Sequence, residues 1–159
     1  MTDSAPSNID RFNQYAGFFL ARLYESFPVP VDLDCHEAVY HRPLLGTPGE
    51  GSISDKELQR ASCDAEVAFA AHTLKWLSET GYFKAEYFRL HDVQAIRVVL
   101  TPKGFEALNA APASLTRSGP LGQQLSDLSK SAANEAGKAA IGEIVGQIIG
   151  VALKGLFTP

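Results

Sequence analysis

Two stretches of the sequence decide the fold: TLKWLSETGYF at residues 73–83 and VVLTPKGFEAL at residues 98–108. The first has leucines at the spacing of one helix face, and Gly81 then provides a helix C-terminus because glycine tolerates a left-handed backbone. The second begins with a β-branched run and predicts a new helix, with Thr101 as its N-cap and Pro102 in its first turn. Together the stretches predict a helix, a strand and another helix in that order.

The segment between these two helices predicts a β-hairpin. Residues 82–90 and 95–100 are rich in β-branched and aromatic residues, and 91–94 would form the loop. Upstream, apolar residues recur every three or four positions over 8–27 and predict an amphipathic helix, for which Asn8 is the expected N-cap. Further helices are predicted from capping patterns and helical spacing: a short one over 35–40, a short one from Ser54, and a longer one over 63–80.

The two stretches resemble the winged helix-turn-helix superfamily, such as the MarR-type and PadR-type bacterial regulators. In that family a helix with two leucines and a following glycine leads into a β-hairpin, the wing, which ends in the pattern LT.KG...L. The segment FPVPVDLD at 27–34 also looks like one in small bacterial proteins of this kind. The matching positions in the two stretches are Leu74, Leu77, Gly81, Leu100, Thr101, Lys103, Gly104 and Leu108.

The resemblance implies an α+β, mainly helical fold and, with the composition, a division of the chain into three parts. Residues 8–112 would form a winged-helix domain with a β-hairpin wing. Residues 113–122 have the proline, serine and glycine content of a linker, and residues 123–157 would form a C-terminal hydrophobic helix. Members of this superfamily bind either DNA or protein, so the fold leaves the function open.

The C-terminal helix predicts a contact with another helix. Gly142, Gly146 and Gly150 recur every four residues beside an apolar face. Each glycine inside a helix costs about 1 kcal/mol relative to alanine, so three in register indicate a close approach that offsets the cost. We expect self-association through this helix. The alternatives are packing on its own domain and a membrane contact, which the charge of Glu143 disfavours.

The charge of the chain is acidic and unevenly distributed. The formal net charge is −4, with ten basic against fifteen acidic residues in 1–115 and four basic against three acidic in the remainder. Nucleic-acid binders usually carry a basic excess, because neutralisation of phosphates supplies much of the affinity. The composition therefore disfavours DNA binding unless the basic residues gather in one local patch.

The DNA hypothesis nevertheless predicts particular contacts. The helix over 63–80 would enter the major groove and the hairpin would contact phosphate or the minor groove, although Asp64 and Glu66 near the helix start oppose this. Candidate DNA contacts are the cationic or polar residues of the helices and the hairpin: Lys56, Arg60, His72, Thr73, Lys75, Arg89, His91 and Arg97.

The protein-binding hypothesis rests on an aromatic pair and on the C-terminal helix. Phe69 and Trp76 are expected on the non-core face of the helix over 63–80, where aromatic side chains suit a protein interface. Candidate interface residues are Phe69, Trp76, Gly142, Gly146, Gly150, Ile141, Ile148 and Ile149.

No group of residues predicts an enzyme, a cofactor site or a metal site. Phosphate-binding, dinucleotide-binding and nucleophile-elbow patterns are absent from the sequence, and Cys35 and Cys63 lack the spacing of a zinc site. Because no apolar signal segment opens the sequence, we expect free thiols and a cytoplasmic location. The predicted function is a non-enzymatic, oligomerising protein-interaction adaptor; the alternatives are a dimeric DNA-binding transcriptional regulator and a membrane-associated protein acting through the glycine-rich tail.

Overall fold

A four-stranded antiparallel sheet lies against a group of helices in the computed structural model, which describes residues 6–41, 53–89, 91, 93–110, 119–131 and 135–157. The protein is α+β and mostly helical, as the sequence predicted. The elements follow the chain in the order α1 (Asn8–Ser26), β1 (Val31–Asp34), α2 (Cys35–His41), α3 (Ile53–Glu79), β2 (Phe83–Lys84), β3 (Tyr87–Arg89), β4 (Gln94–Leu100), α4 (Pro102–Asn109), α5 (Leu121–Ser131) and α6 (Glu135–Phe157).

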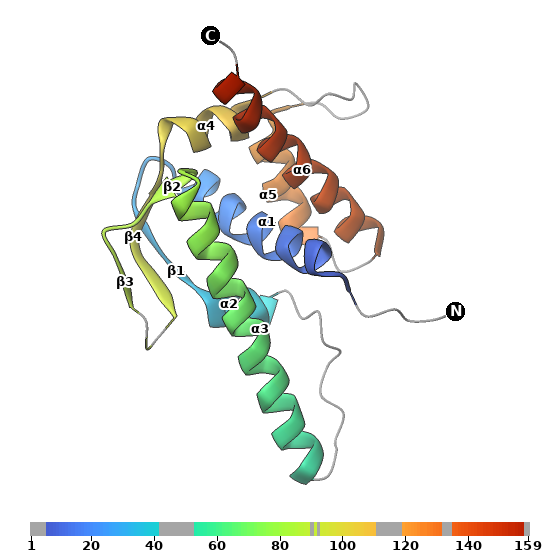
Figure 1. Ribbon diagram of the computed structural model, residues 1–159. Coiled ribbons are helices and arrows are strands. Elements are labelled where there is room, and N and C mark those ends of the chain that lie inside the picture. The colour runs from blue at the N-terminus through green and yellow to red at the C-terminus, as the bar shows by residue number, and fades with distance from the viewer. Residues whose placement is uncertain are drawn as a thin grey trace.

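Strand β4 is the centre of the sheet. β1 pairs with one side of β4, and β2 and β3 pair with its other side. The pairs Phe83 with Leu100 and Tyr87 with Ile96 keep one register, so β2 and β3 are two segments of a single interrupted strand. The predicted hairpin is therefore present, and its outer strand lies at the periphery of the molecule (Figure 1).

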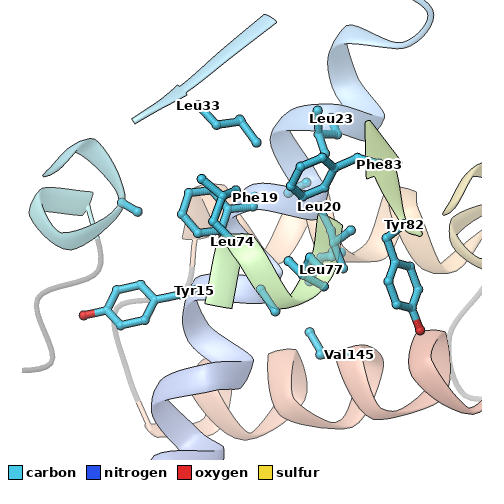
Figure 2. Packing of buried hydrophobic residues seen from close by; sticks show 14 of the residues in the cluster. Tyr15, Phe19, Leu20, Leu23, Leu33, Leu74, Leu77, Tyr82, Phe83 and Val145 are labelled. Atoms are coloured by element: carbon cyan, nitrogen blue, oxygen red, sulfur yellow. The ribbon is translucent and has the colours of Figure 1, made fainter. Parts of the chain in front are cut away.

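Helix α1 is the central helix of the core. It packs against α3 on one side and against α5 and α6 on another, so that the C-terminal helices complete the same core as the N-terminal part (Figure 1). Figure 2 shows the buried side chains of α1 and α3 meeting near Val145 of α6. The largest fully buried side chains include Tyr15, Phe19, Leu20, Leu23, Leu33, Leu77, Tyr82, Phe83, Leu108, Leu121, Leu125 and Ile141.

Three predicted helix boundaries differ from the structure. The N-cap of α1 is Ser7 rather than Asn8, because Ser7 and Asp10 form a reciprocal capping box through two bonds of 3.1 Å. The two helices expected from Ser54 and over 63–80 are one helix, α3, because residues 53–79 contain neither glycine nor proline to end it. The single C-terminal helix expected over 123–157 is instead two helices, α5 and α6, and α5 begins two residues earlier, at Leu121.

The LT.KG pattern forms the corner between β4 and α4. The Thr101 hydroxyl accepts a hydrogen bond from the Gly104 amide at 3.1 Å and donates to the Gly81 carbonyl, while Lys103 Nζ donates to the Thr80 carbonyl at 2.5 Å. A Cβ on Gly104 would lie 2.0 Å from the carbonyl oxygen of Tyr82, so only glycine fits there. Within the described structure, these residues hold the C-terminus of α3 against the start of α4.

Candidate functional site

Of the candidate DNA contacts on α3 whose side chains the structure describes, two are exposed and one is buried. Thr73 is only 3% exposed and donates its hydroxyl to the Phe69 carbonyl at 3.1 Å, so its expected role as a DNA contact is wrong. Lys75 is exposed, but its ammonium lies 3.8 Å from Glu79 one turn later. His72 is exposed, whereas the side chains of Lys56 and Arg60 lie outside the described residues.

A buried polar network explains why Glu66 does not face outward. Its carboxylate accepts from Arg11 at 2.5 Å and from the hydroxyl of Tyr15 at 2.5 Å, and it is buried between α1 and α3. Burial, together with the hydrogen bond to this carboxylate, raises the pKa of Tyr15 well above its usual range. Glu66 therefore joins two helices of the core and takes no part in the surface charge of α3.

Only one residue of the predicted aromatic pair is well exposed to a partner. Phe69 is partly buried, with the guanidinium of Arg11 4.0 Å from its ring centroid and the ring of Tyr15 6.1 Å away. Trp76 remains 41% exposed, although its ring forms a T-shaped contact with Phe12 at a centroid distance of 5.2 Å. Of the pair, Trp76 alone presents a large exposed aromatic surface.

The C-terminal helix uses its apolar face inside the molecule. Ile141 and Ile148, expected at an interface with another molecule, are buried in the core, and Ile149 is half-buried against it. This placement contradicts their expected role at an external contact.

Within the described part of one chain, Gly146 and Gly150 of α6 make no close approach to another helix. A Cβ on Gly146 or Gly150 would have no described atom within 4 Å, and one on Gly142 would meet only the Asn13 side chain, at 3.3 Å. The close approaches lie elsewhere. A Cβ on Gly17 would be 2.7 Å from Ile141 Cγ2, and one on Gly122 would be 2.5 Å from the ring of Tyr24.

Polar contacts add to the docking of α5 and α6 on α1. Glu25 of α1 accepts a hydrogen bond from the Ser126 hydroxyl and forms an ion pair with Lys130 at 2.9 Å. In the first half of α1, the Gln14 side-chain amide donates to the Lys138 carbonyl at 3.3 Å. The C-terminal segment is therefore integrated into the core rather than held apart by a linker.

The hairpin carries the most unusual surface of the described structure. All three residues of β3 are exposed, including two aromatic side chains, Tyr87 at 46% and Phe88 at 42%. An ordinary half-buried strand alternates exposed and buried residues, so a strand exposed throughout is not explained by core packing. Arg89 lies with its guanidinium 6.0 Å from the Tyr87 ring centroid, which places both side chains on one face of the strand.

The remaining hairpin cations surround β3 without forming a dense patch. Lys84 and His91 are exposed, as the hypothesis for His91 required. Arg97 is exposed too, but its guanidinium pairs with Glu86 on the neighbouring strand at 2.9 Å. The hairpin therefore combines exposed aromatic rings with a formal charge of only +1 over residues 82–100, from three Lys or Arg against two acidic residues.

Two residues, one just before the central strand β4 and one within it, have a rare backbone conformation. Val93 has φ +52° and Arg97 has φ +50°, values that side chains other than glycine seldom adopt. At Arg97 the pairing with β1 shifts, and the Arg97 amide donates to the Asp32 carboxylate at 2.9 Å instead of to a strand partner. Strained positions of this kind often lie beside functional surfaces, and here Val93 directly precedes β4 and Arg97 lies within it.

The other site classes have little support within the described residues. No group of three or more histidine, cysteine or acidic side chains there is placed to hold a metal ion. Burial raises the pKa of the Cys35 thiol to about 12, and Cys63 is exposed. None of the described helices has the length and apolar character needed to cross a bilayer. Comparisons with protein-family models, curated proteins and solved structures found no match to this chain.

Proposed function

We propose that this chain is a non-enzymatic winged-helix module that acts by binding another protein through its hairpin. The observation that carries the proposal is β3, a strand at the edge of the sheet with Tyr87, Phe88 and Arg89 all exposed. Tyrosine, phenylalanine and arginine are enriched at the centre of protein interfaces, because they bury large areas and also form polar contacts.

The order of elements supports the winged-helix part of the proposal. A helix, a short strand, a short helix, a long helix and a hairpin follow one another, and the next helix begins at the LT.KG corner. In the superfamily that the sequence resembles, the hairpin is the wing and the long helix is the recognition helix. The binding surface proposed here is accordingly the wing and the adjoining part of α3.

A protein partner fits the surface charges better than DNA does. The described outward face of α3 carries exposed Asp64 and Glu79, and Glu79 also neutralises Lys75. A recognition helix that approaches phosphates needs the opposite sign of charge. Trp76, which is exposed on the same helix, adds an aromatic contact of the kind that protein interfaces use.

DNA binding by a dimeric regulator is the second candidate, and the hairpin cations favour it. Lys84, Arg89 and His91 are exposed and could contact phosphates if the wing lay along a groove. This candidate predicts affinity for generic duplex DNA that falls steeply as salt rises.

Site-specific photo-crosslinking tests the proposed function. A photoreactive amino acid would replace Phe88 in the full chain, expressed in its native cells, and a matched variant would carry it at Tyr40, which is 82% exposed on α2. We expect a discrete protein adduct from position 88 and none from position 40. No protein adduct at position 88, or duplex DNA binding with a steep salt dependence by the purified chain, would contradict the proposal.

Point variants are required for this test rather than a truncated chain. Cutting after residue 115 would remove six members of the core cluster: Leu121, Leu125, Ile141, Ile144, Val145 and Ile148. The shortened chain would lose the packing partner of α1, so a change in its binding or assembly would report unfolding.

A further inference from the structure

We propose that the protein bound at the hairpin is a second copy of this chain, whose β3 pairs antiparallel with the open edge of β3 in a register centred on Phe88. This inference rests on the proposed function, because it identifies the partner of the same surface. The pairing would join two sheets into one continuous sheet across a two-fold axis.

The two edges of the sheet differ in a way that favours assembly at β3. Strand β1 follows Pro28 and Pro30 and carries Asp32 and Asp34, and proline and charge are features that discourage edge pairing. The β3 segment lacks proline and exposes two aromatic rings, and among the described strands it pairs only with β4. An edge with these properties either aggregates or has a specific partner.

Symmetry limits the possible registers of two β3 strands. A two-fold axis perpendicular to the sheet keeps each face of the sheet on one side, and residues directly opposite each other must share a face. The axis must therefore pass through a residue position rather than between two residues. For a strand of three residues, this leaves registers centred on Tyr87, on Phe88 or on Arg89.

Side-chain chemistry selects among these three registers. Centring on Arg89 places two guanidinium groups opposite each other, and centring on Tyr87 places the Glu86 carboxylate opposite Phe88. Centring on Phe88 pairs the two phenylalanines on one face and pairs each Tyr87 with Arg89 of the other copy on the opposite face. Aromatic pairs and cation–π pairs both stabilise strand neighbours, so this register is self-complementary.

The contacts within one chain already show the Tyr–Arg half of this arrangement. Arg89 and Tyr87 share a face, with the guanidinium 6.0 Å from the ring centroid. In the pair of chains each guanidinium would lie between two tyrosine rings, one from each copy. Because the strand has three residues, the interface is small, and we expect a weak dimer whose population rises with concentration.

Sedimentation equilibrium of the full chain, from about 10 µM to about 1 mM, measures this association. Replacing Tyr87 with arginine places like charges opposite each other twice, and we expect the dimer dissociation constant to rise about tenfold or more. Tyr87→Glu places a carboxylate opposite each Arg89, and we expect the dimer to be retained or strengthened. Tyr40→Ser, which removes an exposed aromatic residue from α2, is the control and should leave the dimer unchanged.

A cross-linking experiment tests the position of the axis. In a Cys63→Ser background, Phe88→Cys places two thiols opposite each other, whereas Tyr87→Cys places them a diagonal step apart. We expect disulfide-linked dimers from Phe88→Cys under mild oxidation and few from Tyr87→Cys. Circular dichroism of each variant checks that the fold is kept.

The outcomes separate this inference from the proposed function. If both Tyr87 variants weaken association equally, or if wild-type chain stays monomeric at every concentration, the proposed pairing is overturned. A position-88 photo-adduct that contains a different protein would also overturn it, while the proposed function would stand. If position 88 yields no protein adduct and the chain stays monomeric, both fail.

Discussion

Two sets of glycines in this protein have opposite surroundings. Gly17, Gly104 and Gly122 lie where another part of the chain approaches so closely that a Cβ would overlap it, at 2.7, 2.0 and 2.5 Å from the nearest atoms. Gly146 and Gly150 have no described atom within 4 Å of such a Cβ. The regularly spaced set attracts attention in the sequence, yet the irregular set is the one that packing requires.

The comparison shows what a glycine pattern can and cannot indicate. Regular spacing on one helix identifies residues that share a face, but it contains no information about what covers that face. Gly17 is required because Ile141, which is more than one hundred residues later in the chain, packs against it. A contact of this kind has no local signal in the sequence.

The largest expected effect is at Gly104. Gly104→Ala brings a methyl group onto the Tyr82 carbonyl oxygen, which is backbone and cannot rotate away, and we expect a loss of about 3 kcal/mol or more in the free energy of unfolding. Urea denaturation followed by circular dichroism measures it, with Gly146→Ala as the matched control. Equal stability of the two variants would show that the β4–α4 corner is looser than described.

The next effect is at the contact between α1 and α6. Gly17→Ala gains about 1 kcal/mol in helix propensity but forces Ile141 to move, and overpacking of a core typically costs 1–3 kcal/mol. We expect a net loss of about 1 kcal/mol by denaturation. The double variant Gly17→Ala with Ile141→Leu, which conserves volume but has no methyl branch at Cβ in place of Ile141 Cγ2, should recover part of that loss if the two residues touch. An unchanged loss in the double variant would argue against the contact.

At Gly146 we expect the opposite sign. Gly146→Ala adds a methyl group in open space, so the monomer should gain about 1 kcal/mol in the free energy of unfolding. If the outer face of α6 also contacts another chain closely, the same change would weaken self-association while it stabilises the fold. Denaturation measures the change in stability, and sedimentation measures the change in self-association. A variant that gains stability and associates as strongly as the wild type would contradict self-association through α6.

The smallest expected effect is on how stability depends on pH, at the contact between Glu25 of α1 and helix α5. The hydrogen bond from Ser126, with further help from Lys130, lowers the pKa of the Glu25 carboxyl below its ordinary value near 4.5. Because the folded-state pKa is lowered, this contribution to stability is present above the unfolded pKa and is lost as the pH falls through the folded pKa. Glu25→Gln should therefore reduce the loss of stability between neutral pH and about pH 3, measured by urea denaturation. An identical pH profile in the variant would exclude this carboxylate as a contributor.

Much of the N-terminal part could be predicted from local sequence signals. The amphipathic spacing of α1, the glycine after α3 and the Thr101–Pro102 start of α4 act over a few residues, and each element forms where they indicate. Prediction was poorer where two local signals competed. The capping residues inside 53–79 suggested two helices, but an uninterrupted run of helix-compatible residues forms one.

The candidate sites were harder to predict, because exposure depends on which elements pack together. Helical spacing placed Phe69, Thr73 and Trp76 on one outward face, but Thr73 is buried, and Arg11 and Tyr15 of α1 cover part of Phe69. The exposed pair Tyr87 and Phe88 was missed, since its residues have the composition of an ordinary strand. The available signal was the short run Tyr-Phe-Arg at 87–89. It lacks the alternation of apolar and polar residues that is typical of a half-buried strand.

The sequence by itself determined the secondary structure around the hairpin, the α+β and mainly helical class, and the start of α4 at Thr101 and Pro102. These features depend on backbone preferences and hydrogen bonds between near neighbours. Only the tertiary structure decided that α5 and α6 belong to the core, that Glu66 is buried with Arg11, and that Gly17 rather than Gly146 marks a close contact. Those features depend on contacts between residues far apart in the chain, where many pairings satisfy the same local pattern and packing selects one of them.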